Sequence, residues 1–495
     1  MQPKTAAFSP LDKAGSRVYY LTEIIFTEFQ FSKEVIPLFV ARSEELAQLA
    51  AAMKQSNHAA LVYGKRRVGK TRLIKEALKA QNRTAIYYEC IRGTIRENVD
   101  AFVKVLIEEH ILSFSPSFET IQDVFALLNS FPREFVVVID EYPYLSTFAE
   151  SKKIDSIFQN IIDNRLGNIS LILSGSQISV MKNLLEEKDA LYGRFGLIIH
   201  LQELNYREAA AFYPSKTAYE KIAFYSVFGG SPFALQQLRE EETLEQNIVR
   251  TILTPSNPVH LYASNLLLSD YSNAVNAERI LSVLGNGKKK YSELENKLDM
   301  NSTGNLAKQL KSLVAMELVC QNAPINKAKD PKKKYYEIND NLMRFYYTYV
   351  YPNKSTLQMI GEQTFFEQIV SQTLLKDFVP RRFEEQCRSF FSVLARAGKL
   401  PGITNIGTYY YDDPANHKNG EFDVALAFGD EYEICEAKYY KKPMTLAEIH
   451  HEAGQVREIK ALKVVRMGFI AVAGFEEKEA GYRYYTGEDL YRENI

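Results

Sequence analysis

The sequence predicts an α/β chain of several domains, beginning with a parallel sheet covered by helices. The first observation behind this prediction is a buried apolar strand at 61–63, which runs through a glycine-containing loop into a helix at 71–79. The second is a series of further apolar strand candidates that alternate with helical stretches. The third is the length of 495 residues, which is enough for about two to four domains that each bury a core.

The alternation of strands and helices places the first domain at residues 36–230. A helix at 43–54, with leucine and alanine at helical spacing, precedes the first strand. Residues 1–35 are expected to be an N-terminal extension. This order of elements is typical of a parallel sheet with helices on both faces. The remaining strand candidates are 85–88, 136–139, 171–173 and 197–201.

Two further segments follow the first domain. Residues 231–275 have helical periodicity and few strand signals, which predicts a small helical lid. Residues 276–350 are predicted to form a winged helix-turn-helix, because three helices are followed by a lysine-rich loop and a strand. These elements are expected at 277–285, 291–298 and 302–318 for the helices, 324–334 for the loop and 335–338 for the strand.

The charge of the chain is balanced as a whole but not locally. The formal net charge of −1 predicts no polyanionic partner by itself. Residues 286–334 hold eleven lysines and five acidic residues, a local balance of +6. We therefore predict DNA binding, with Lys308 and Lys311 near a groove and the loop at 327–334 on phosphates. The alternative is that this segment only packs between the first and last domains.

Composition indicates a folded cytoplasmic protein. The hydrophobic content of 46% and the charged content of 24% are those of average globular chains. The cysteines, at 90, 320, 387 and 435, are far apart and lack metal-ligand spacing, which argues against a disulfide scaffold and a zinc site. No signal peptide is expected, because Glu23 and Glu28 interrupt the apolar stretch near the N-terminus. No membrane span is expected either, because no apolar run reaches about 18 residues.

The loop after the first strand carries a phosphate-binding pattern. Two glycines, a lysine and a hydroxyl stand at fixed offsets, which predicts a P-loop that binds ATP with Mg²⁺. The glycines let backbone N–H groups point inward at phosphate oxygens, and the following helix N-terminus adds partial positive charge. Lys70 is expected to reach the β and γ phosphates, and Thr71 to ligate Mg²⁺. The predicted site consists of Gly64, Lys65, Arg66, Arg67, Val68, Gly69, Lys70 and Thr71.

Polar residues at the ends of later strands complete the predicted ATP site. Asp140 and Glu141 end an apolar strand, the arrangement that puts Asp140 by the metal and Glu141 by an attacking water. Ser176 ends the next strand and either senses the γ-phosphate or belongs to a plain turn. Arg194 either stabilises phosphoryl charge, in cis or from a neighbouring subunit of a homo-oligomer, or forms a surface ion pair.

Several motifs, in order, resemble the archaeal-type ATPase family of the AAA+/STAND branch of P-loop NTPases. Besides the P-loop and the Asp140–Glu141 strand, these are Phe39–Leu46, Leu173–Ser176, Tyr192–Phe195 and Gly229–Pro232. The resemblance implies an ATP-driven switch whose lid, near the last of these motifs, closes on the nucleotide. One departure is Ala41, where the family usually has glycine. This departure concerns the assignment of that segment to the adenine pocket.

The C-terminal part, residues 356–495, contains a second group of charged residues. Apolar and polar residues alternate from Phe422 to Phe428, and Gly429-Asp430 turns the chain into a strand that ends at Lys438. In this hairpin Asp423 lies across from residues 436 and 437, while Glu436 and Lys438 share a face. Asp423 and Glu436 are suited to ligate Mg²⁺ for phosphodiester hydrolysis, with Lys438 steering a water or its charge. The alternative is a hairpin with a charged solvent face.

This hairpin resembles the PD-(D/E)XK nuclease family, which has a restriction-endonuclease-like α/β fold. The resemblance implies a further acidic ligand from an earlier helix, and Phe383–Gln386 offers Glu384, with Glu385 as the second choice. It also implies an assisting role for Gln455 in a later helix. Domains of this kind recur in archaeal-type ATPases and often serve binding alone.

Two functions follow from these features. The preferred one is an ATP-binding and ATP-hydrolysing protein that acts on DNA through a metal-dependent, nuclease-like C-terminal domain. The other is a STAND-type signalling or scaffold NTPase whose C-terminal domain only binds a partner. Intact carboxylates would not by themselves decide between the two, because the nuclease-like fold serves both purposes.

Overall fold

The computed structural model describes residues 41–146, 151–270, 274–298, 305–413, 418–459 and 462–492. The predicted N-terminal extension lies outside these residues, and so does the start of the helix predicted at 302–318. Within the described residues, no helix is both long and apolar enough to cross a membrane.

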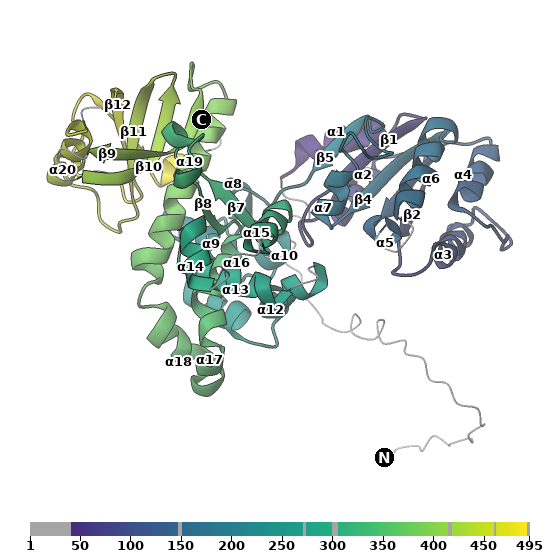
Figure 1. The fold of residues 1–495 in the computed structure, drawn as a ribbon, viewed down its shortest axis with the longest axis horizontal. Coiled ribbons are helices and arrows are strands. Elements are labelled where there is room, and N and C mark those ends of the chain that lie inside the picture. Colours follow the sequence, from purple (N-terminus) through teal and green to yellow (C-terminus); the bar gives the residue numbers. More distant parts are fainter. Residues whose placement is uncertain are drawn as a thin grey trace, which may run out of the picture. The chain divides into compact units, whose positions relative to one another are not determined.

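The first sheet is parallel throughout and has the strand order β2-β3-β4-β1-β5 (Figure 1). Every residue of β3 and β4 is buried, because helices cover both faces of the sheet. The predicted α/β class and all of the predicted strands of this domain are confirmed. The strands are β1 His58–Tyr63, β2 Thr84–Glu89, β3 Phe135–Asp140, β4 Ile169–Gly175 and β5 Leu197–His200.

Different helices cover the two faces of the first sheet. On one face, α3, α4 and α6 bury an apolar cluster against alternate strand residues such as Leu61, Val137 and Leu171. On the other face lies α1, since the Ser170 hydroxyl, next to Leu171, donates to the Ala52 carbonyl at 3.2 Å. The helices are α1 Ser43–Met53, α2 Lys70–Lys79, α3 Ile95–Glu108, α4 Ile121–Ser130, α5 Pro143–Ser146, α6 Ser151–Asn164 and α7 Ile178–Asn183.

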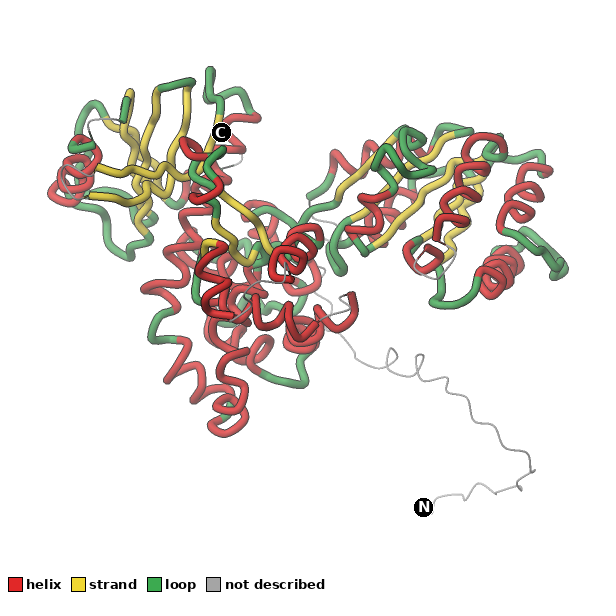
Figure 2. The backbone as a smooth tube through the Cα atoms, viewed as in Figure 1, coloured by secondary structure: helices red, strands yellow, loops and turns green. Residues whose placement is uncertain are grey.

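The chain after β5 is helical, as predicted for residues 231–275. Figure 2 shows these helices in red. Capping boxes at Asn205, Thr217 and Thr243 fix three of the helix starts, because each side chain accepts a backbone N–H three residues on. The helices are α8 Tyr206–Ala209, α9 Ala218–Phe228, α10 Pro232–Leu235, α11 Leu244–Ile248 and α12 Pro258–Asp270.

Residues 274–338, called here the middle unit, combine helices with a small antiparallel sheet of order β6-β8-β7. The helices expected at 277–285 and 291–298 and the strand expected at 335–338 are confirmed. The short strands β6 and β7 were not predicted. The elements are α13 Ala274–Gly285, β6 Lys289–Lys290, α14 Tyr291–Leu298, α15 Asn305–Ala315, β7 Val319–Asn322 and β8 Tyr335–Ile338.

The loop between β7 and β8 packs on the last domain. The Asn326 side chain donates to the Tyr410 carbonyl at 2.8 Å and accepts the Tyr410 N–H at 3.1 Å. The Lys333 ammonium lies 3.6 Å from the centre of the Tyr410 ring. Lys327 and Lys329 of the same loop are exposed. Part of this loop is therefore used for packing, and part faces solvent.

The last domain is built on a mixed sheet of order β13-β12-β11-β10-β9. Strands β9, β10 and β11 are antiparallel, and β12 and β13 continue the sheet in parallel. The predicted hairpin is confirmed. The elements are α16 Asn341–Phe345, α17 Lys354–Ile360, α18 Glu362–Phe365, α19 Val379–Arg396, β9 Asn405–Asp413, β10 Lys418–Phe428, β11 Glu431–Lys438, α20 Leu446–Arg457, β12 Val464–Ala471 and β13 Tyr482–Thr486.

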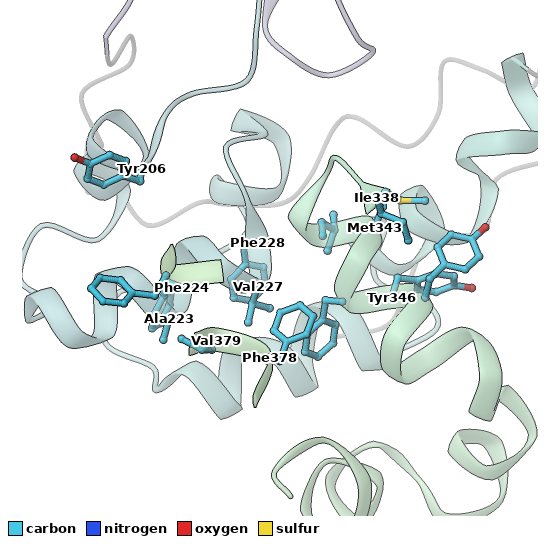
Figure 3. Packing of buried hydrophobic residues seen from close by; sticks show 14 of the residues in the cluster. Tyr206, Ala223, Phe224, Val227, Phe228, Ile338, Met343, Tyr346, Phe378 and Val379 are labelled. Atoms are coloured by element: carbon cyan, nitrogen blue, oxygen red, sulfur yellow. The ribbon is translucent and has the colours of Figure 1, made fainter. Parts of the chain in front are cut away.

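One apolar core runs from the helical segment through the middle unit to the C-terminal sheet (Figure 3). Phe224 and Phe228 of α9, Tyr346 after α16, and Phe378 before α19 are among its buried members. Because these helices share one core, none of them can shift alone without exposing apolar surface. A separate apolar cluster fills the space between the C-terminal sheet and α20.

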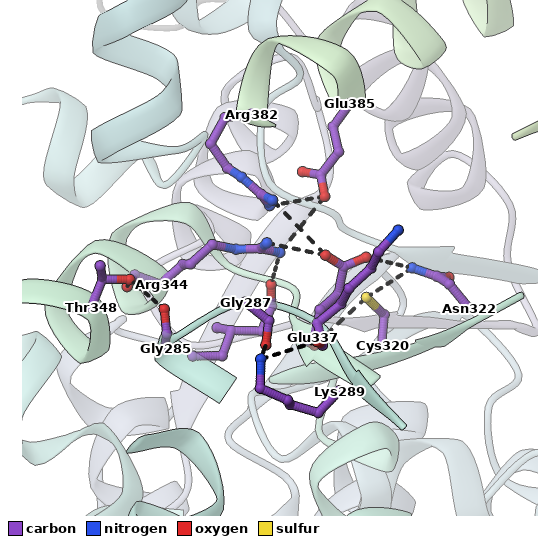
Figure 4. A network of polar contacts seen from close by, with 12 residues as sticks. Gly285, Gly287, Lys289, Cys320, Asn322, Glu337, Arg344, Thr348, Arg382 and Glu385 are labelled. Atoms are coloured by element: carbon purple, nitrogen blue, oxygen red, sulfur yellow. Dashed lines mark hydrogen bonds and ion pairs between the residues drawn. The ribbon is translucent and has the colours of Figure 1, made fainter. Parts of the chain in front are cut away.

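A buried ionic network joins β8, α16 and α19 (Figure 4). Arg344 donates to Glu337 at 3.0 Å, and Arg382 donates to Glu385 at 2.9 Å. Arg382 also lies 4.0 Å from Glu337. Burial alone would raise the pKa of Glu337, but the two guanidinium groups outweigh it and lower that pKa to about 2. The network therefore ties the middle unit to the long helix of the last domain.

Replacing Glu337 by Gln is expected to destabilise the protein strongly. Two buried guanidinium groups would then lose the carboxylate that lies between them, and leaving a buried charge uncompensated costs about 3–5 kcal/mol. Chemical denaturation measures the loss. Asp377→Ala is the control, because its ion pair with Arg381 has both side chains more than half exposed and is worth less than about 1 kcal/mol. Equal unfolding midpoints for the two variants would contradict this account.

Candidate functional site

The loop between β1 and α2 needs glycine at both of its predicted positions. A Cβ on Gly64 would lie 2.2 Å from the Leu201 carbonyl oxygen, too close for any side chain. Gly69 has a φ of 99° and occupies the N-cap of α2. The loop can therefore curl tightly at both ends, and it delivers the N-terminus of α2 to the carboxyl edge of the sheet.

Two cations hold this loop in shape. The buried Lys70 ammonium donates to the carbonyls of Gly64 and Lys65, both at 3.0 Å. From outside the loop, the Arg42 guanidinium donates to the Val68 carbonyl at 3.0 Å and to the Gln202 carbonyl at 2.8 Å. The residue before it, Ala41, has a φ of 63°, which is a conformation that favours glycine. Sequence reasoning missed this role of Arg42.

Thr71 and Asp140 meet beside the loop. The Thr71 hydroxyl donates to Asp140 Oδ2 at 3.0 Å, and the Tyr87 hydroxyl donates to the same oxygen. Asp140 is only 2% exposed, and its other oxygen accepts the N–H of Glu141 at 2.9 Å. Burial, followed by the charge of Asp140, raises the pKa of Tyr87, so this phenol stays a donor. The hydroxyl and the carboxylate are hard oxygen donors and fit the predicted Mg²⁺.

Glu141 and Ser176 lie side by side at the ends of β3 and β4. Glu141 Oε2 accepts the Ser176 hydroxyl at 2.8 Å and the Ser176 N–H at 3.2 Å. Glu141 has a φ of 50°, a rare conformation that turns its side chain from the strand axis. Across from Asp140 on β2 stands Glu89, whose pKa is raised by burial and by Asp140 and Glu141. Glu89 was missed, because it follows no recognisable motif.

A cleft of about 680 Å³ opens beside the loop. Lys70 and Thr71 line it from the start of α2, Glu141 from the end of β3, and Pro232 and Phe233 from the start of α10. The Arg67 guanidinium stacks 3.7 Å above the Phe233 ring, which joins the loop to the helical segment. The cleft thus lies between the loop and the segment predicted to be a lid.

Lys65 is part of the loop by its backbone only. Its side chain, 13% exposed, reaches Glu203 at 3.4 Å and Asp340 at 3.7 Å. Burial, followed by repulsion from Asp340, raises the pKa of Glu203 to about 7. Asp340 also caps α16 by accepting the N–H of Met343 at 3.0 Å. The side chain of a predicted nucleotide ligand therefore connects the loop with the segment that follows the middle unit.

Arg194 forms a bidentate ion pair with Asp163. Its Nε donates to Asp163 Oδ1 at 2.9 Å, and its Nη2 donates to Oδ2 at 3.0 Å. This is the geometry of the surface ion pair named as the alternative above. A role in phosphoryl transfer stays a prediction.

In the last domain, Lys438 of β11 lies between two acids, one from β11 and one from α20. Val424 of β10 pairs with Cys435 of β11, and the same antiparallel register continued by one residue sets Asp423 opposite Glu436. The Lys438 ammonium lies 2.8 Å from Glu436 Oε1 and 2.8 Å from Glu452 Oε1. Glu452 belongs to α20 and was missed, because its partner is distant in the chain. Gln455, predicted to assist, instead bonds His451 at 2.9 Å.

Glu384, Asp423 and Glu436 form what we call the carboxylate cluster. Burial, followed by repulsion from Asp423, raises the pKa of Glu384 to about 8. Burial also raises the pKa of Asp423 and that of Glu436. The three groups thus share one poorly solvated region, and their oxygens suit a hard divalent cation. Glu385 belongs to the arginine network instead. Yet in the described parts of the chain no three acidic, histidine or cysteine side chains are arranged to hold a metal.

Two family models match the chain. Residues 39–238 match an ATPase domain predominantly from Archaea, which confirms the predicted resemblance for this segment. Residues 346–452 match a family of archaeal and bacterial proteins of unknown function. The chain therefore carries an archaeal-type ATPase domain, while the nuclease-like nature of the last domain stays a prediction.

Individual proteins also resemble the chain. An uncharacterized protein of Methanocaldococcus jannaschii is 27% identical over 401 residues, covering 79% of this chain and 85% of that protein. The Walker-type ATPase of Pyrococcus abyssi has 18% identity and a TM-score of 0.49, over 62% of this chain and 96% of its own. The ORC2 protein of Aeropyrum pernix has 13% identity and a TM-score of 0.43, over 66% and 97%.

Replacing Glu384 by Gln is expected to stabilise the protein in a pH-dependent way. A carboxyl whose folded pKa is about 8 favours folding when protonated, and this contribution is lost as pH rises from about 4 to about 8. Gln keeps the shape and removes the titration. The variant should therefore gain about 1–3 kcal/mol over the native protein at about pH 8, and little at about pH 4.

Thermal unfolding at both pH values measures this difference. The exposed Glu431→Gln on β11 is the control and should behave as the native protein at either pH. A gain from Glu384→Gln that is independent of pH would show that packing, and not titration, is responsible.

Proposed function

We propose that the ATPase domain binds ATP with Mg²⁺ and hydrolyses it. The observation that carries this proposal is the contact between Thr71 and Asp140 beside a glycine-bounded loop. When bound, Mg²⁺ neutralises the charge of the β and γ phosphate oxygens. Thr71 and Asp140 would hold it. Lys70 would turn from the loop carbonyls to the phosphates.

Glu141 would orient the attacking water in this proposal. In the structure its carboxylate accepts two hydrogen bonds from Ser176, so hydrolysis needs these bonds to be loosened or shared with the water. Ser176 would then be the residue that reports the γ-phosphate to Glu141. This assignment agrees with the role predicted for Ser176. The two hydrogen bonds from Ser176 to Glu141 would carry the signal.

Two variants separate binding of ATP from its hydrolysis. Lys70→Ala should weaken ATP binding by about tenfold or more, because the P-loop lysine that is expected to reach the β and γ phosphates is lost. Glu141→Gln should retain ATP and slow hydrolysis by about 10²-fold or more. Binding of a fluorescent ATP analogue and release of phosphate measure the two effects.

Arg96→Ala is the matched control for both variants, since Arg96 pairs with Asp100 on the exposed face of α3. It should change neither readout. If Lys70→Ala held the nucleotide as tightly as this control, the loop would not be the phosphate site.

We also propose that the last domain is a restriction-endonuclease-like domain that acts on DNA. Its elements run helix α19, antiparallel β9, β10 and β11, helix α20 and parallel β12. The carboxylate cluster lies on this frame beside Lys438, and it would hold a divalent metal that polarises the scissile phosphate. The middle unit would be a winged helix that binds DNA, since Lys308 and Lys311 of α15 are exposed.

One observation favours the second function, in which the last domain only binds a partner. Lys438 is neutralised by Glu436 and Glu452, each at 2.8 Å, so its charge is already engaged. A STAND-type switch would use the same ATPase domain and would need no cleavage.

Cleavage assays decide between the two functions. The full chain is incubated with single-stranded and duplex DNA in Mg²⁺ or Mn²⁺. Asp423→Asn and Lys438→Ala should each lower the cleavage rate by about 10²-fold or more, because a metal ligand or the charge beside it is lost. Lys441→Ala, an exposed lysine just past β11, is the control. Tight DNA binding without any cleavage by the native protein would favour the binding-only function.

A further inference from the structure

A cavity of about 270 Å³ lies between the middle unit and the last domain. Lys288 and Tyr335 line it from the middle unit, and Arg381 and Arg388 line it from α19. Two members of the carboxylate cluster, Glu384 and Asp423, also line it. Cations and acids from two domains therefore face one shared space, which we call the composite cleft.

Lys288 is the residue of the middle unit that contacts an acid of the last domain beside this cleft. Its ammonium lies 2.7 Å from Glu421 Oε2 on β10, two residues before Asp423, and 4.5 Å from the centre of the Tyr335 ring. Asp423 lines the same cavity as Lys288. Lys288 thus stands directly beside the predicted metal ligands.

The neighbouring lysines are used differently. The ammonium of Lys289 donates to the carbonyls of Asn286, Gly287 and Lys288 at 3.0–3.3 Å, which closes the turn before β6. Lys290 is exposed. Of the triplet formed by the consecutive lysines 288, 289 and 290, Lys288 is therefore the member that lines the composite cleft.

The pairing of Lys288 with Glu421 is of a kind that a ligand can displace. The Lys288 side chain is 42% exposed, and ion pairs with this much solvent contribute little to stability. The other carboxylate oxygen of Glu421, Oε1, is buried and has no hydrogen-bond partner among the described residues. Glu421 therefore holds the ammonium through one oxygen only, and the ammonium can turn to a stronger anion by giving up this ion pair and its contact with the Tyr335 ring.

We propose that Lys288 contacts a DNA phosphate in the composite cleft, so that the nuclease-like site is built by the middle unit and the last domain together. The inference rests on the proposed action of the last domain on DNA. A phosphodiester next to the carboxylate cluster needs cations on its far side, because its own charge and the acids repel each other. Lys288 of the middle unit and Arg381 of α19 both line the cleft and would supply them.

The geometry also indicates a path for the strand. A backbone that passes the carboxylate cluster would run through the composite cleft, between the turn before β6, which carries Lys288, and α19, which carries Arg381. The middle unit and the last domain would then both contact one segment of nucleic acid. Specificity for DNA structure would depend on both.

The test compares Lys288→Ala with Lys290→Ala in the full chain, which remove the same charge from the same triplet. Fluorescence anisotropy measures the affinity for labelled single-stranded and duplex DNA at several salt concentrations, with Mg²⁺ and with EDTA. Lys288→Ala should weaken binding by about five- to tenfold and reduce the slope of log affinity against log salt by about 1. Lys290→Ala should leave both nearly unchanged. Circular dichroism melts of both variants check that the fold is intact.

A second variant should act in the opposite direction. Glu421→Gln removes the partner that now holds Lys288, so DNA affinity should rise by about two- to fivefold. A purely structural pair would not give this increase. Equal losses for Lys288→Ala and Lys290→Ala, or no gain from Glu421→Gln, would overturn the inference. If the native chain bound no DNA at all, the proposed function itself would fall, and this inference with it.

Discussion

The ATP site depends on one constraint, the parallel alignment of β1, β3 and β4 within the first sheet. Parallel strands end at the same edge, so the loop after β1, Asp140 at the end of β3 and Ser176 after β4 must lie near each other. The strand order sets β4 between β1 and β3, which leaves a space between the loop and Asp140. The Thr71 side chain, on the first turn of α2, spans that space.

The parts of the ATP site and of the C-terminal site that the sequence predicted are those that depend on contiguous residues. The loop, the apolar β3 and the β10–β11 turn at Gly429 each carry a local pattern. Arg42, Tyr87 and Glu452 carry none, because their partners are distant in the chain and depend on the packing of α1, the register of β2 and the position of α20. The two-residue strand β6 is too short for any period to show.

The side chain of Lys65 shows how a motif can be right while one of its residues has a different role. Its backbone closes the loop, yet its ammonium lies between Glu203 and Asp340. A second ionic link, from Lys182 of α7 to Glu317 at 2.7 Å, joins the ATPase domain to the middle unit. Burial alone would raise the pKa of Glu317, but hydrogen bonds from His200 and Lys182 outweigh this effect and lower the pKa to about 2. Charged contacts therefore join the loop to the cap of α16 and join α7 to the middle unit.

The carboxylate cluster is a destabilising feature of the fold, because it places three acids in a poorly solvated region. Lys438 supplies one positive charge for both Glu436 and Glu452. Burial and the neighbouring Asp423 raise the pKa of Glu384. A chain selected for stability alone would replace one of these acids with an apolar residue or an amide, because buried charges without partners are costly. Local conflicts of this kind are expected at functional sites. The region around Glu384 and Asp423 is therefore where a cation or a cation-bound substrate would gain most from binding, and where the chemistry of the last domain is expected to take place.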